Sequence, residues 1–134
     1  MQRIRLAAAV VWTLTIMALC WLSPKWVQKV QHSSSWFELP SLDKIVHWGI
    51  FCVFAVLWLR VSVSSRRYWL VALGGLALAA ITELVQNLPI VNRDGNVADA
   101  ITDLIGVLIG LAIGSRVEPL LRFVEARLFG KTLT

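Results

Sequence analysis

Four apolar stretches dominate the sequence, and each is close to the length that crosses a lipid bilayer. They cover roughly residues 4–22, 44–61, 68–88 and 97–115. A helix needs about 20 apolar residues to span the hydrocarbon core. Backbone polar groups in hydrocarbon must bond within their own segment, which a helix achieves and a lone strand does not. No stretch alternates apolar and polar residues, so barrel strands are excluded. The sequence predicts an all-α integral membrane bundle of four transmembrane helices.

The composition supports the membrane class. The chain has 134 residues, of which 57% are hydrophobic, and its mean hydropathy is +0.71. A soluble domain of this size could not bury so much apolar surface in one core. The net charge of +5 does not indicate a nucleic-acid partner, because the basic residues flank the apolar stretches instead of forming one patch. We expect a single transmembrane domain over residues 1–134.

The first stretch and the cysteines have simple interpretations. Residues 1–24 begin with basic residues, as a signal peptide does, but the apolar run is long and three more follow. Leu19 is also too large for a lipoprotein cleavage box, so we expect a retained first helix. Cys20 and Cys52 lie inside apolar stretches and read as small buried hydrophobes.

Basic residues predict the orientation of the bundle in the membrane. Those on one side are Arg3, Arg5, Arg60, Arg66, Arg67, Arg116, Arg122, Arg127 and Lys131. Those on the other are Lys25, Lys29, Lys44 and Arg93. The side richer in Lys and Arg is normally cytoplasmic. We therefore expect an inner-membrane protein with both termini in the cytoplasm.

Tryptophans and the tail fit the same frame. Trp21, Trp26, Trp36 and Trp48 fall near the outer boundary, and Trp58 and Trp69 near the inner one, as interfacial anchors do. Over residues 116–130, apolar residues recur at helical spacing with basic residues between them. This pattern predicts a C-terminal amphipathic helix on the cytoplasmic leaflet. A short partner-binding helix is the alternative interpretation of this segment.

Polar residues of three predicted helices meet at the outer membrane surface. Asp43 and His47 are four residues apart and share a helix face, and Glu83 and Gln86 share another. A third face carries Asp99, Asp103, Gly106 and Gly110. The glycines allow close approach of a neighbouring helix. We expect this face to pack on the helix over 68–88 or the helix over 44–61.

Several of these residues also have simpler structural roles. Asp43 could cap its helix, and Asp99 could belong to a capping box with Asn96. Lys44 could extend to the head groups, and Asp94 is typical of a turn. Glu83 is harder to explain in this way, because it lies inside the end of its span, where no cap is needed. Intramembrane carboxylates usually face the bundle and pair with another group.

The cluster could support acid–base chemistry. A histidine flanked by carboxylates transfers protons near neutral pH. We expect His47 and Glu83 to act as acid and base, with Asp43 and Asp99 as orienting residues. We expect the Arg93 guanidinium to hold an anionic group of the substrate. The other predicted substrate-binding residues are Gln86, Lys44 and Asp103.

Other chemistries receive less support. His47, Glu83, Asp99 and Asp103 could in principle hold a metal, but no recognised zinc spacing is present. No metal or other cofactor is expected.

The order of these motifs resembles that of VanZ-like membrane proteins. The family pattern is D-K-x-x-H-F, then E-x-x-Q, then R followed by D-x-x-x-N-x-x-G-x-x-x-G. This chain has "DKIVHW" at residues 43–48, "ELVQ" at 83–86 and "DAITDLIGVLIG" at 99–110. Trp48 replaces the phenylalanine, and Asp103 stands where the pattern has asparagine. The resemblance covers about residues 22–114.

The resemblance implies a small multi-pass bacterial membrane protein, in a family associated with low-level teicoplanin resistance. Together with the polar cluster, it favours binding or modification of an envelope lipid or lipid-linked precursor by hydrolysis or transfer. One alternative is a non-catalytic interaction or shielding protein whose polar cluster is a structural ion-pair network. Another is an ion carrier, which is less favoured because the inner halves of the helices lack an ionisable relay. The sequence leaves open a homo-oligomer.

Overall fold

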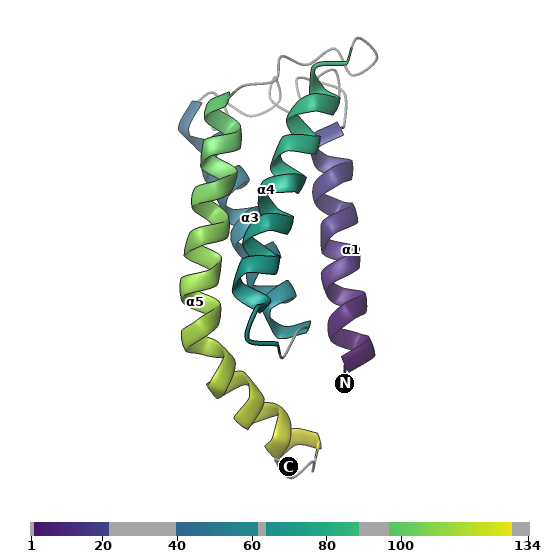
Figure 1. Cartoon of the computed structure of the whole chain (residues 1–134), viewed down its shortest axis with the longest axis vertical. Coiled ribbons are helices and arrows are strands. Elements are labelled where there is room, and N and C mark those ends of the chain that lie inside the picture. The colour runs from purple at the N-terminus through teal and green to yellow at the C-terminus, as the bar shows by residue number, and fades with distance from the viewer. Residues whose placement is uncertain (1, 22–39, 62–63, 89–96, 130–134) are drawn as a thin grey trace.

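The computed structural model describes residues 2–21, 40–61, 64–88 and 97–129; these residues are almost all helical, and none of them is in a strand. In chain order the helices are α1 (Gln2–Trp21), α3 (Pro40–Val61), α4 (Arg67–Gln86) and α5 (Val97–Phe129). Figure 1 shows them side by side as an elongated bundle. Each contains a segment long and apolar enough to cross a membrane. The four predicted spans are therefore confirmed as helices.

The helix limits differ from the predicted spans mainly at the start of α3 and at the end of α5. α3 begins four residues early, at Pro40, because proline is well tolerated in the first turn of a helix. α5 continues to Phe129 through Pro119, and no separate helix over 116–130 is seen. Proline inside a helix removes one backbone hydrogen bond and bends the axis. The C-terminal part of α5 indeed runs in a different direction in Figure 1.

Glycines determine the closest helix contact, between α3 and α5. A Cβ atom on Gly106 would lie 2.3 Å from the Trp48 carbonyl oxygen, and one on Gly110 would lie 2.3 Å from that of Cys52. Only glycine allows backbones to approach so closely. The predicted glycine face is therefore confirmed, and its neighbour is α3.

The side chains show the pattern expected of a protein surrounded by lipid. Ile16, Phe51, Ala55 and Val107 belong to a small core shared by several helices. Large apolar side chains also face outward on every helix, with Leu108 63% exposed. In water such an apolar surface would promote aggregation, whereas in a bilayer it contacts lipid tails.

Two tryptophans join α1 to α3 by hydrogen bonds. Trp12 Nε1 donates to the Ile50 carbonyl oxygen, and Trp58 Nε1 donates to Thr13 Oγ1, both at 2.9 Å. Trp58 therefore also joins two helices, in addition to the predicted role as an interfacial anchor. Trp69 is 74% exposed, as expected for such an anchor.

Candidate functional site

The predicted polar elements lie at one end of the bundle. The first residues of α3 and α5 and the last residues of α4 are all at the end opposite to the start of α1 and the end of α5 (Figure 1). Three helices thus bring their polar residues to a common level. This arrangement agrees with the one predicted from the order of the spans.

A buried histidine–aspartate pair joins α3 to α5 at this end. His47 Nδ1 lies 3.0 Å from Asp103 Oδ1, and the two side chains are 7% and 1% exposed. Asp103 is one turn before Gly106, whose contact with the Trp48 backbone holds α5 against the same turn of α3. The close glycine contact therefore positions the carboxylate beside the imidazole.

The geometry assigns a chemical role to each ring nitrogen of the histidine. A neutral imidazole that donates from Nδ1 to a carboxylate carries its basic lone pair on Nε2. The carboxylate also stabilises the imidazolium form, should the ring take up a proton. We assign this tautomer from the hydrogen bond. An imidazole oriented in this way can act as a general base through Nε2.

Asp103 was predicted to bind substrate, whereas the orienting role was predicted for Asp43 and Asp99. Asp99 is half-buried in the first turn of α5. Asp43 belongs to α3, but its side chain lies outside the described part of the structure. The described carboxylate that contacts the imidazole is that of Asp103.

The polar residues of α4 have different surroundings. Gln86 is 2% exposed, and its Nε2 donates to the Cys20 carbonyl oxygen of α1 at 3.1 Å. This bond gives Gln86 a role in joining two helices, in addition to any contact with substrate. Glu83, one turn earlier, is half-buried. Both residues belong to the last turns of α4, which lie at the polar end of the bundle.

The remaining predicted site residues are less well placed. Lys44 is exposed, in keeping with a side chain that extends to the head groups. Arg93 and Asp94 lie outside the described residues, so the predicted anion-holding guanidinium is not located. Over the described ranges, no group of three or more His, Cys, Asp or Glu side chains is arranged to hold a metal ion.

The opposite end contains ion pairs that sequence analysis missed. The carboxylate of Glu125 bridges Arg5 of α1 and Arg60 of α3. Glu118, 5% exposed at its side chain, bridges Arg67 of α4 at 2.9 Å and Arg122 of its own helix at 2.5 Å. Both acids belong to the extended part of α5, which therefore ties the other three helices together. The sequence signal was the presence of two acids among the basic residues of this end.

Glu118→Gln is expected to lower the free energy of unfolding by about 2 kcal/mol, the usual worth of hydrogen bonds to a charged group. The substitution keeps the shape but removes the charge shared by two arginines. SDS titration followed by circular dichroism measures the loss. Arg116→Gln, at an exposed position on the same helix, is the control. Equal stability of the two variants would show that the Glu118 pairs are incidental.

Comparisons with family models, with curated proteins and with solved structures find no match for this chain. Its residues and their geometry therefore indicate what it could do.

Proposed function

We propose that the protein is a VanZ-like membrane protein that binds an envelope lipid or lipid-linked precursor and modifies its head group by hydrolysis or transfer. The observation that supports this best is the pairing of His47 with Asp103 at the polar end of the bundle. In this proposal His47 is the acid–base residue and Asp103 orients it. Glu83 is the complementary acid or base, and Arg93 holds the anionic group.

Charge distribution supports an inner-membrane location with both termini in the cytoplasm. The basic residues Arg3, Arg5, Arg60, Arg66, Arg67 and Arg116 lie at the end of the bundle where α1 starts and α5 ends. That end would face the cytoplasm by the positive-inside rule. The polar end would then open toward the outer leaflet, where envelope precursors are used.

The last turns of α5 have the character proposed for an interfacial segment. Leu120, Phe123, Val124 and Leu128 are exposed, whereas Glu118 and Glu125 face the other helices. The exposed apolar face would rest in the cytoplasmic leaflet, with Arg116 and Arg127 at the head groups.

A non-catalytic function is the second candidate, and the depth of the pair favours it. Asp103 is 0% exposed and His47 is 6% exposed. A buried pair of this kind could serve only to fix the contact between α3 and α5. The protein would then bind or shield a lipid or partner without chemistry.

Lipid mass spectrometry tests the proposed function. The full chain is purified from membranes as the wild type, as Glu83→Gln and as the control Ser115→Ala, an exposed position on α5, and the lipids that accompany it are identified. We expect a phosphate-bearing lipid or its modified product with the wild type and the control. Glu83→Gln should reduce it at least about three-fold, an effect of less than 1 kcal/mol. Identical lipids in all three samples would contradict a role for the polar end.

A further inference from the structure

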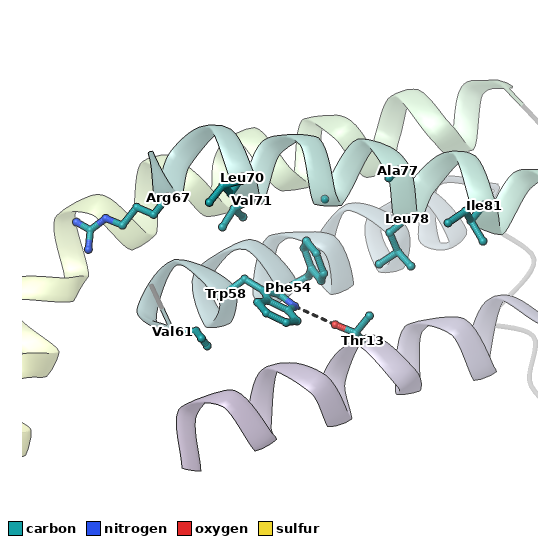
Figure 2. A pocket seen from close by; sticks show the side chains of 11 residues that line it. Thr13, Phe54, Trp58, Val61, Arg67, Leu70, Val71, Ala77, Leu78 and Ile81 are labelled. Atoms are coloured by element: carbon teal, nitrogen blue, oxygen red, sulfur yellow. Dashed lines mark hydrogen bonds between the residues drawn. The ribbon is translucent and has the colours of Figure 1, made fainter. Parts of the chain in front are cut away.

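A second feature of the bundle begins at the end opposite to His47 and Asp103 and is independent of the proposed function. An apolar groove of about 460 Å³ runs between α1, α3 and α4. Figure 2 shows α4 along one side and α1 along the other, with α3 between them. Its walls include Phe54, Leu70, Leu78 and Ile81. The volume is in the usual range of ligand pockets, about 300–1,000 Å³.

The groove has the length and shape of a lipid tail. Along α4 it extends from Arg67 to Ile81, a distance of about 21 Å at 1.5 Å per residue. One leaflet of a bilayer has a hydrocarbon thickness of about 15 Å. Gly74 leaves the middle of the groove open, because a Cβ atom there would meet nothing within 4 Å. An extended acyl chain can therefore lie along α4.

A polar cleft begins where the groove ends. This cleft, of about 440 Å³, is lined by Ser64, Ser65, Arg67, Tyr68, Glu118 and Arg122. Arg67 lines both spaces, so the apolar groove and the polar cleft meet at its side chain. An amphiphile placed with its tail in the groove would have its head group in the cleft.

The charge of this region favours an anionic head group. Arg66 and Arg67 stand at the N-terminus of α4, where the helix dipole is already positive, and the first turn has no acidic residue. Within the cleft, Arg67 and Arg122 share the one carboxylate of Glu118. Trp69, two residues after Arg67 in α4, is 74% exposed, as expected for an anchor at the level of the head groups.

We propose that this groove and cleft bind an anionic phospholipid, with one acyl chain along α4 and its phosphate beside Arg67. The site would take lipid from the leaflet on the side of the chain termini. Its head-group cleft is thus at the opposite end of the bundle from His47 and Asp103. Binding there would fill the gap between α1 and α4 and strengthen the bundle.

Native mass spectrometry of the full chain in detergent tests the proposal with two probes, dioleoyl phosphatidylglycerol and dioleoyl phosphatidylcholine. We expect the wild type to bind the anionic lipid about five-fold more tightly, as one basic residue near a phosphate allows. Gly74→Leu should fill the groove and weaken phosphatidylglycerol binding about ten-fold. Gly49→Leu is the matched control, because a Cβ atom at Gly49 also meets nothing within 4 Å and this residue does not line the groove.

A third variant tests the head-group contact. Arg67→Gln should abolish the preference for phosphatidylglycerol over phosphatidylcholine while tail binding remains. Circular dichroism establishes that this variant is folded, since Arg67 also pairs with Glu118. Should this variant fail to fold, the relative affinity of the wild type for the two lipids still tests whether the site prefers an anionic head group.

Any of four results would overturn the proposal. The first is equal binding of the two lipids by the wild type, and the second is unchanged binding by Gly74→Leu. The third is a dimer without lipid that Gly74→Leu dissociates, because a second copy of the chain would then fill the groove. Displacement of phosphatidylglycerol by millimolar inorganic phosphate alone would likewise contradict a contribution from the tail.

Discussion

Replacing Gly106 and Gly110 together by alanine is expected to destabilise the folded bundle strongly. Each new Cβ atom would lie 2.3 Å from a backbone carbonyl oxygen of α3, at Trp48 and at Cys52. Backbone atoms cannot rotate away as a side chain can, so the two helices would have to separate. Overpacking of this kind costs about 1–3 kcal/mol at each position. The sum of about 2–6 kcal/mol is a large share of the stability of a small domain, about 5–15 kcal/mol.

The yield of monodisperse protein and its SDS denaturation curve measure this effect. Gly49→Ala is the control, because its Cβ atom would meet nothing within 4 Å. It should be as stable as the wild type or more so, since alanine favours a helix over glycine by about 1 kcal/mol. If the double variant retained the wild-type curve, α3 and α5 would not pack as described.

Asp103→Asn is expected to preserve the fold and remove most of the proposed activity. The amide oxygen can still accept the hydrogen bond from His47 Nδ1, but the negative charge that stabilises an imidazolium is lost. General acid–base catalysis contributes about 100-fold to 10,000-fold, so turnover should fall by at least about 100-fold. Conversion of the lipid identified by mass spectrometry provides the assay.

Asp103→Leu separates the two roles of this residue. It removes the carboxylate that lies 3.0 Å from the imidazole, in a region where both side chains are buried. Leaving the buried Nδ1–H of His47 without an acceptor costs about 1–3 kcal/mol, so this variant should be destabilised as well as inactive. Full activity in Asp103→Asn, with destabilisation only in Asp103→Leu, would favour the non-catalytic alternative. The result also shows whether aspartate can be exchanged here for the asparagine of the VanZ-like pattern.

Much of the fold could be predicted because hydropathy and length are properties of each segment alone. The four apolar stretches became α1, α3, α4 and the first part of α5. The face formed by Asp103, Gly106 and Gly110 could also be predicted, since helical spacing fixes which residues share a face. Its partner remained open between two helices, because spacing within one helix does not state how its neighbour is rotated.

The contacts between helices were harder to predict for the same reason. The pairing of His47 with Asp103 depends on the closeness of α5 to α3, which the glycines allow but the sequence does not quantify. The ion pairs of Glu118 and Glu125 depend on α5 continuing past Pro119. The pattern over residues 116–130 predicted a separate amphipathic helix on the membrane surface, not a continuation of α5 packed on the bundle.

Nitrogen-15 NMR of the histidine rings, on the full chain in detergent, tests the central claim most directly. The chain has two histidines, so His47→Gln identifies the signals of His47. We expect a protonated Nδ1 whose resonance shifts strongly when Asp103 becomes alanine. A ring that carries no proton on Nδ1, or whose signals are the same with and without the Asp103 carboxylate, would contradict the account.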